Sequence, residues 1–183
     1  EVVSVQATAD AVTHWVAVGR DITQRKNAED MIRHLAFYDA LTDLPNRQLL
    51  LDRLQRALTE SARTRQFGAL MFIDLDNFKP LNDTYGHGVG DQLLIEVARR
   101  ITSCVREVDS VARFGGDEFV VMLGELDIDE AGSVEQAGII AEKIRITLAE
   151  PYLLKIQQEG KAGMAIDHHC SASIGIVVFN GET

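Results

Sequence analysis

Residues 111–123 read Val-Ala-Arg-Phe-Gly-Gly-Asp-Glu-Phe-Val-Val-Met-Leu. The β-prone segments Val111–Phe114 and Asp117–Leu123 flank Gly115-Gly116, and this order predicts two strands joined by a two-residue turn. The strands of such a hairpin are antiparallel, so a purely parallel sheet cannot contain them. The chain is therefore expected to form a mixed or mainly antiparallel sheet.

Segments of helical and extended character alternate on both sides of this hairpin. The continuous apolar run Gly68–Ile73 has the length of a strand and predicts one that is buried in the centre of the sheet. Further elements are expected as helices near residues 24–38, 48–65, 93–101 and 133–149, a polar connection over 77–90, and a last strand over 171–179. This order predicts an α+β fold with a central, mainly antiparallel sheet flanked by helices.

The composition excludes several classes of protein. The chain has 183 residues, 46% of them hydrophobic, which is enough for one full domain with a sizeable core. Its formal net charge of −10 argues against a nucleic-acid partner, because nucleic-acid binders are normally basic. Cys104 and Cys170 do not form a disulfide framework or zinc spacing, so they are interpreted as buried free thiols. A cytoplasmic location is expected, with any membrane anchor of a parent protein lying outside this segment.

Two acidic pairs lie where strands are expected to end. Asp74 and Asp76 follow the buried strand, and Asp117 and Glu118 follow the two glycines of the hairpin. If these strands are neighbours, their ends bring the carboxylates together, and carboxylates so close repel unless a cation lies between them. Oxygen ligands suit Mg²⁺, and paired metal ions between carboxylates serve phosphoryl transfer. The alternative is that these side chains are merely solvated at loop ends.

A polar stretch, Phe78–Asp91, follows the first acidic pair. Lys79 could neutralise a phosphate beside the carboxylates. Asn82 and Asp91 provide an amide and a carboxylate, and this pair matches the hydrogen-bonding edge of guanine better than that of adenine. The alternative is that Asp91 caps a helix and Asn82 forms a turn.

These segments resemble, in sequence order, motifs of the GGDEF family of diguanylate cyclases. The resemblance is carried by Asp39–Arg47, Asp74–Asp91, Arg113–Phe119 and Ser171–Ile176, so it extends over residues 39–183. It implies a fold like that of nucleotidyl cyclases and polymerase palm domains, which is ferredoxin-like.

The resemblance also implies roles for individual residues. The implied ligands of Mg²⁺, or of Mn²⁺ in its place, are the side chains of Asp74 and Asp117, the backbone carbonyl of Leu75 and the side chain of Glu118. The implied nucleotide-binding residues are Asn77, Phe78, Lys79, Asn82, His87 and Asp91. In this scheme Asn82 and Asp91 read guanine, His87 lines the site, and Lys79 with nearby backbone amides holds the phosphates and stabilises transition-state charge. Asp117 is also the implied proton acceptor.

The family's reaction joins two GTP molecules into cyclic di-GMP and releases two pyrophosphates. Each domain holds one GTP, so the two-fold symmetric product implies a homodimer. Arg106 and Asp109 have the family's spacing for an inhibitory product site, which predicts that bound cyclic di-GMP inhibits the enzyme. The alternative for this pair is a surface ion pair of little energetic value.

A second function stays open at this point. The domain could sense GTP or cyclic di-GMP without catalysis and regulate an EAL phosphodiesterase domain in the same parent chain. His34–Asp39 and the long insert after Leu123 resemble such tandem proteins, whereas the intact Asp117 favours catalysis. An ATP-using cyclase or polymerase is disfavoured by the pairing of Asn82 with Asp91.

The residues before the first motif resemble a different module. His14–Thr23 is similar to the last strand and exit motif of a PAS sensor domain. Residues 1–23 are therefore expected to be the C-terminal remnant of a PAS domain and residues 24–38 a linker helix. The GGDEF domain is expected over 39–183 and to be truncated at its C-terminus, because the family continues with another helix.

Overall fold

The computed structural model describes residues 21–156 and 164–181. The chain divides into two compact units, residues 1–36 and 37–183, and each is described by itself. The first unit contains nearly all of α1 (Thr23–Phe37). The bounds of this helix differ by one residue at each end from those of the helix expected over 24–38. The residues expected to be a PAS remnant lie almost wholly outside the described part of the chain.

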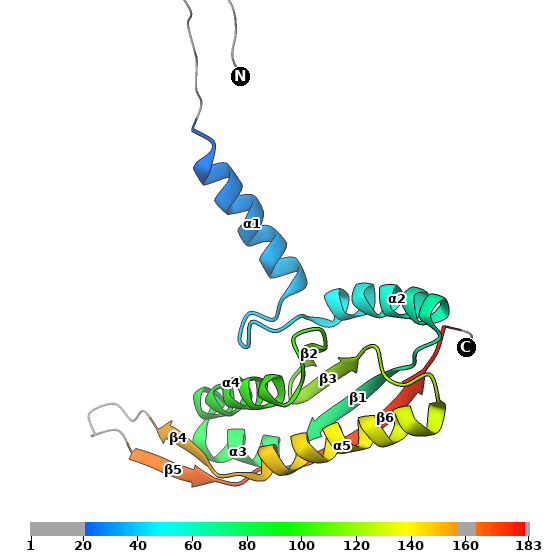
Figure 1. The fold of residues 1–183 in the computed structure, drawn as a ribbon. Coiled ribbons are helices and arrows are strands. Elements are labelled where there is room, and N and C mark those ends of the chain that lie inside the picture. The colour runs from blue at the N-terminus through cyan, green and yellow to red at the C-terminus, as the bar shows by residue number, and fades with distance from the viewer. Residues whose placement is uncertain (1–20, 157–163, 182–183) are drawn as a thin grey trace, which may run out of the picture. The chain divides into compact units, whose positions relative to one another are not determined.

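The second unit is built on a four-stranded antiparallel sheet with the strand order β2-β3-β1-β6 (Figure 1). Its strands are β1 (Gly68–Leu75), β2 (Ser110–Gly115), β3 (Glu118–Leu123) and β6 (Ala172–Phe179). β1 pairs with β3 and with β6, and β3 pairs with β2, in each case antiparallel. The predicted α+β fold is therefore confirmed, and the strand order is that of a ferredoxin-like split β-α-β arrangement.

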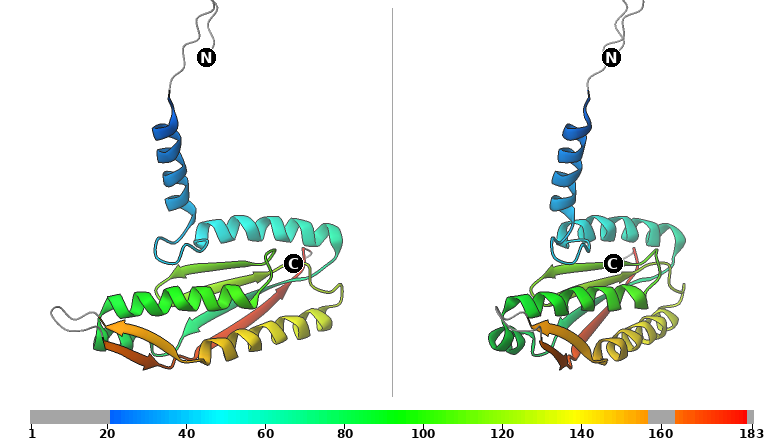
Figure 2. Two further views of the ribbon diagram at one scale, coloured as in Figure 1. Left: turned by 60° about the vertical axis from the view of Figure 1, so that its left-hand side comes forward. Right: turned by 90° about the vertical axis from the view of Figure 1, so that its left-hand side faces the viewer.

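Helices cover both faces of this sheet (Figures 1 and 2). The helices of this unit are α2 (Arg47–Thr64), α3 (Phe78–Tyr85), α4 (His87–Cys104) and α5 (Glu130–Ala149). The main core lies between the sheet and helices α4 and α5, and it contains the fully buried Ile73, Phe119 and Ile144. A smaller core lies on the opposite face, where Leu50 of α2 packs with Val120 of β3. The alternation of β3 residues between the two cores follows from the period of two in a strand.

A second, two-stranded sheet was missed by the sequence prediction. β4 (Tyr152–Ile156) and β5 (Met164–His168) pair antiparallel beside α4. Gln92 of α4 attaches this sheet, because its side chain accepts from the backbone N–H of Lys155 at 2.9 Å and donates to the Lys155 carbonyl at 2.8 Å.

Arg100 of α4 connects three elements although it is buried. Its guanidinium lies 3.7 Å from the centroid of the Tyr152 ring. It donates to the carbonyl oxygens of Thr147, Glu150 and Pro151 at distances between 2.7 and 3.1 Å. These carbonyls lie at the C-terminal end of α5 and the turn that follows, so Arg100 satisfies acceptors that a helix end leaves unpaired.

Other differences from the prediction concern boundaries. The polar connection expected over 77–90 contains α3 and the first turn of α4, which begins at His87. In the hairpin, Gly115 pairs with Glu118 and the register shifts between Arg113 and Gly115, so the turn residues are Gly116 and Asp117. Gly116 has a φ of 53°, a left-handed conformation that glycine adopts without steric cost. Among the described helices, none is long and apolar enough to span a lipid bilayer.

Candidate active site

The acidic pairs that were predicted to meet lie together at one end of the sheet. Asp74 near the end of β1 is the cross-strand partner of Glu118, the first residue of β3. Asp117 precedes Glu118 in the turn between β2 and β3. This proximity follows from antiparallel pairing, because the end of β1 and the start of β3 share one edge of the sheet.

The carboxylates at this edge affect one another's ionisation. Partial desolvation and the charges of Asp117, Glu118 and Asp76 raise the pKa of Asp74 above its ordinary value. Within the described ranges, no basic side chain forms an ion pair with Asp74. The protein therefore leaves this negative charge uncompensated, which is favourable for a site that receives a cation.

An open hollow of about 630 Å³ lies at this edge. It is lined by Asp74, Leu75, Asp76, Asn77, Phe78, Lys79, Pro80, Asp117 and Ser171. Lys79 is exposed, and it has no ion-pair partner in the part of the chain that the structure describes. The hollow thus combines crowded carboxylates with an unpaired ammonium group. Glu118 adjoins Asp74 but is not among the residues that line the hollow.

The described residues contain no group of three or more His, Cys, Asp or Glu side chains that could hold a metal ion by themselves. A metal ion at this edge would therefore need backbone, water or substrate oxygens beside the carboxylates. Asp76 accepts hydrogen bonds from Ser171 and Ser173, so its oxygens are already partnered.

Asn82 and Asp91 lie on the adjacent helices α3 and α4. The Oδ1 atom of Asn82 is buried and has no hydrogen-bond partner among the described residues, which is an unusual state for a buried carbonyl. A Cβ atom added at Gly90, the residue before Asp91, would overlap this oxygen. Gly90 therefore allows the Asn82 amide to lie against α4, beside the position that carries Asp91.

The alternative interpretations of Asn82 and Asp91 do not hold in the structure. The N-cap of α4 is Gly86, and Asp91 lies beyond the first turn of that helix with an exposed side chain. Asn82 lies inside α3 and not in a turn. His87 is exposed at the start of α4. The side chains of Asn82 and Asp91 therefore do not cap a helix, and a capping role does not explain why these polar residues occur here.

An ion pair that the sequence did not reveal supports the hairpin turn. Arg113 of β2 donates to the Asp39 carboxylate at 2.9 Å, and it donates to the carbonyl of Gly116 through Nε at 3.1 Å and Nη2 at 2.8 Å. Burial alone would raise the pKa of Asp39, but hydrogen bonds from Thr42 and Arg113 outweigh it and lower that pKa below its ordinary value. The turn that carries Asp117 is thus connected to the segment that opens this unit.

Arg106 and Asp109 form a half-buried network and not a surface ion pair. The Asp109 side chain is 0% exposed and that of Arg106 is 52% exposed. The Asp109 carboxylate accepts from the backbone N–H and the guanidinium of Arg106, at distances between 2.9 and 3.2 Å, and from the N–H of Gly124 at 3.4 Å. Asp109 is therefore occupied by internal partners, and only Arg106 is accessible to a ligand in this arrangement.

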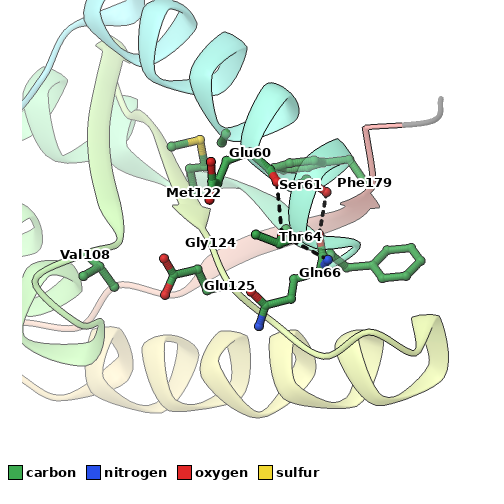
Figure 3. Close-up of a pocket in the computed structure, with 12 residues that line it drawn as sticks. Glu60, Ser61, Thr64, Gln66, Val108, Met122, Gly124, Glu125 and Phe179 are labelled. Atoms are coloured by element: carbon green, nitrogen blue, oxygen red, sulfur yellow. Dashed lines mark hydrogen bonds between the residues drawn. The ribbon is translucent and has the colours of Figure 1, made fainter.

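A smaller cavity of about 140 Å³ lies near this network (Figure 3). It is lined by Gly68 at the start of β1, at the other end of that strand from Asp74. Its lining includes Glu60, Met122, Phe179 and, from the loop segments beside Arg106, Val108 and Glu125. No local sequence pattern predicts this cavity, because its residues come from distant segments.

Both cysteines are buried and free, as predicted. Burial, together with the charges of Asp76 and Asp117, raises the pKa of the Cys170 thiol to about 11. A thiol with this pKa stays protonated at neutral pH and is a poor nucleophile. Burial and this pKa are those of a structural thiol and not of a reactive one.

Comparison with known proteins agrees with this geometry. Residues 36–183 match the family model described as "Diguanylate cyclase, GGDEF domain". The chain is 41% identical over 160 residues to the bifunctional diguanylate cyclase/cyclic di-GMP phosphodiesterase MucR of Pseudomonas aeruginosa. That match covers 87% of this chain and 21% of MucR, so the chain spans about a fifth of that relative.

Solved structures show the same fold. The GGDEF domain of TpbB from Pseudomonas aeruginosa is 39% identical, with a TM-score of 0.67 over 78% of this chain and 75% of that chain. The coiled coil and GGDEF domain of DgcB from Caulobacter crescentus, solved in complex with c-di-GMP, is 26% identical, with a TM-score of 0.73 over 88% of this chain and 79% of that chain. With the family model matched over most of its length and the acidic edge in place, the chain belongs to the GGDEF domain family of diguanylate cyclases.

Proposed function

We propose that this domain condenses two molecules of GTP into cyclic di-GMP with release of two pyrophosphates. The observation that carries the proposal is the meeting of Asp74, Asp117 and Glu118 at one edge of the sheet, beside a hollow that contains Lys79. Phosphoryl-transfer sites need such a combination, because metal-binding carboxylates and a cation together stabilise phosphate charge. The 44% identity to diguanylate cyclase TpbB over 120 residues supports the same reaction.

The residues present fit a divalent cation. The raised pKa of Asp74 indicates crowded negative charge that a cation would relieve. We propose that Asp74 and Asp117 bind Mg²⁺, or Mn²⁺, by their side chains and Leu75 by its carbonyl, with Glu118 as a further ligand. Two carboxylates without a complete protein cage suit Mg²⁺, which keeps waters and shares substrate phosphates. When bound, the ion neutralises phosphate charge and lowers the pKa of the attacking hydroxyl.

The nucleotide is proposed to lie across α3, α4 and the end of β1. The Asn82 amide, whose Oδ1 has no partner among the described residues, and the exposed carboxylate of Asp91 are proposed to hydrogen-bond the guanine edge, with His87 beside them. Lys79 and the backbone amides of Asn77 and Phe78 hold the phosphates. Asp117 accepts the proton of the attacking 3′-hydroxyl.

Because each domain provides one such site, two domains must face each other for the reaction. The 3′-hydroxyl of each GTP then attacks the α-phosphate of the other, and two attacks close a two-fold symmetric ring. We therefore propose a homodimer with C₂ symmetry as the active form.

The test is direct. The purified protein is incubated with GTP and Mg²⁺, and the product is identified by mass spectrometry. Cyclic di-GMP is expected from the wild type and from Asp167→Asn, a control that alters an exposed carboxylate on β5, and not from Asp117→Asn. Product formation by Asp117→Asn at the wild-type rate would reject the assignment of the site.

A non-catalytic role is the second candidate, and one observation favours it. The cyclic di-GMP phosphodiesterase PdeR of Escherichia coli is 34% identical over 163 residues. A GGDEF domain that binds GTP or cyclic di-GMP could thus regulate an EAL domain in the same parent chain. GTP binding without any cyclic di-GMP formation would identify this role.

We also propose that Arg106 forms part of an inhibitory site for cyclic di-GMP. Its half-exposed guanidinium can bind a phosphate or the O6 and N7 atoms of guanine. Asp109 then orients Arg106 and does not contact the ligand unless the network opens. Arg106→Ala is expected to weaken cyclic di-GMP binding at least tenfold in calorimetry and to raise product yield. Unchanged affinity would reject the site.

The segment before this unit is proposed to link it to an upstream sensor. Met31 and Leu35 are exposed on α1 at a spacing that suits helix pairing, and the similar DgcB structure includes a coiled coil. We propose that residues 24–38 form the linker helix and that residues 39–183 form the GGDEF domain.

A further inference from the structure

Asp74 and Asp76, two residues apart at the end of β1, have very different surroundings. Asp76 is bound to the start of β6 by three hydrogen bonds. Its backbone N–H donates to the carbonyl of Ser171 at 2.9 Å. The hydroxyl of Ser171 donates to Oδ2 at 2.6 Å, and that of Ser173 donates to Oδ1 at 3.0 Å.

Both carboxylate oxygens of Asp76 are therefore partnered by the protein. Asp74, in contrast, is crowded by other acids, has no ion-pair partner within the described residues, and has a raised pKa. A carboxylate that receives two hydroxyl hydrogen bonds is held in one orientation. This distinguishes a side chain that is fixed in place from one that is available to a cation.

The residue after Asp76 explains why fixation is needed. Asn77 has a φ of 60°, a left-handed conformation that asparagine adopts more readily than other residues with a Cβ but less readily than glycine. As the N-cap of α3, it makes no side-chain capping hydrogen bond. The start of α3 thus has no side-chain cap, and with its N-cap it contributes Asn77, Phe78 and Lys79 to the hollow.

We propose that Asp76 is a positioning residue that, with Ser171 and Ser173, holds the turn at residues 76–77, and with it the start of α3, in the geometry needed to contact the phosphates. This inference rests on the proposed cyclase function. The hydrogen bonds connect the turn to β6, which also pairs with β1 through Asp74 and Ser173. The turn is thereby fixed relative to the metal-binding edge.

The decisive comparison is between the amide and the alanine at position 76. Asp76→Asn keeps an acceptor oxygen for Ser173, and its amide can donate to the Ser171 hydroxyl. It is expected to keep kcat within about threefold of the wild type and to leave the Mg²⁺ concentration for half-maximal activity unchanged. Asp76→Ala and the double variant Ser171→Ala/Ser173→Ala are expected to lower kcat by about 10–100-fold, the usual effect of losing groups that orient a metal site.

Ser103→Ala is the matched control, because its hydroxyl donates to a carbonyl of its own helix, outside the site. If Asp76→Asn is as damaging as Asp74→Asn and needs more Mg²⁺, Asp76 is a metal ligand and the proposal is wrong. Wild-type kcat in Asp76→Ala would also overturn it.

A second measurement does not depend on turnover. Hydrogen exchange at the backbone amide of residue 76, which donates to the Ser171 carbonyl, is expected to accelerate at least tenfold in Asp76→Ala and to stay close to the wild type in Asp76→Asn. If the wild type forms no cyclic di-GMP, the proposed function fails while this exchange still tests the hydrogen-bonded support. Equal exchange rates in Asp76→Ala and Asp76→Asn would contradict the proposal that the Asp76 hydrogen bonds support this segment.

Discussion

At the scale of single residues, Asp74 shows a conflict between stability and function. Its raised pKa means that the folded protein binds this proton more tightly than the unfolded chain. The associated stability is present at low pH and is lost as the pH rises through the folded pKa. At neutral pH the ionised Asp74 therefore destabilises the metal-free fold.

Asp74→Asn is expected to raise the melting temperature of the metal-free protein at pH 7 and to reduce activity more than about a hundredfold, because a metal ligand is lost. Melting curves with EDTA and with Mg²⁺ provide the check. Mg²⁺ should stabilise the wild type and leave the variant unchanged. A variant that melts below the wild type in EDTA would contradict the electrostatic explanation.

Gly90 provides a second prediction at this scale. In Gly90→Ala the added methyl group would overlap the Asn82 Oδ1, so the amide must rotate away from α4. The displaced atom is the end of a flexible side chain, and alanine favours a helix, so the fold should be little affected. GTP affinity should fall about tenfold, as for the loss of one or two hydrogen bonds to the base, and the preference over ATP should shrink.

Gly138→Ala in α5 is the matched control, because a Cβ there meets nothing within 4 Å. It should leave nucleotide affinity unchanged and stabilise the protein slightly. Calorimetric titration of both variants with GTP and ATP distinguishes the effects. If Gly90→Ala binds GTP as tightly as the wild type, Asn82 does not contribute to binding of the base.

At the scale of elements, the hairpin and the central strand were predictable because their signals are local. Alternation of turn residues with β-prone runs gave β1, β2 and β3 within one or two residues, and antiparallel pairing then placed Asp74 beside Glu118. The register shift between Arg113 and Gly115 was not predicted, because a two-residue Gly-Gly turn was expected and the turn residues are Gly116 and Asp117.

Elements that depend on tertiary contacts were missed. α3 contains Pro80, Asn82 and Asp83, residues typical of turns, yet a proline is tolerated in the first turn of a helix. β4 and β5 are short and receive part of their support from Gln92 of α4. The Asp39–Arg113 pair joins residues 74 positions apart, and one sequence contains no sign of such a contact.

The Asp39–Arg113 pair should determine how the opening segment resists acid. Hydrogen bonds lower the pKa of Asp39, so the stability it contributes is present above the unfolded pKa and is lost as the pH falls through the folded pKa. Asp39→Asn should lower the free energy of unfolding by about 1–3 kcal/mol at pH 7, the usual effect of losing a charged hydrogen bond. The difference from the wild type should shrink towards pH 3. Denaturant titration across this range provides the measurement, and a constant difference would contradict it.

At the scale of the whole molecule, the proposed reaction needs two chains. Activity per mole of protein should therefore rise with protein concentration and level off once dimers are saturated. Mixing the wild type with an excess of Asp117→Asn should reduce activity below simple dilution, because mixed dimers have one defective site. Specific activity that is independent of concentration over a range in which sedimentation shows dissociation would contradict the two-domain mechanism.

The buried Arg100 has a consequence for how freely this sequence can vary. Its planar fork reaches carbonyls of three residues while its face lies against Tyr152, and no other side chain can supply this set of donors in that geometry. Its neighbour Arg99 has a side chain that is 68% exposed, and within the described ranges its one partner is Glu96. In a library that samples every substitution under selection for folded protein, codon 100 should retain arginine and reject even lysine. Position 99 should accept most polar residues. Two adjacent arginines would then differ widely in how many substitutions they tolerate.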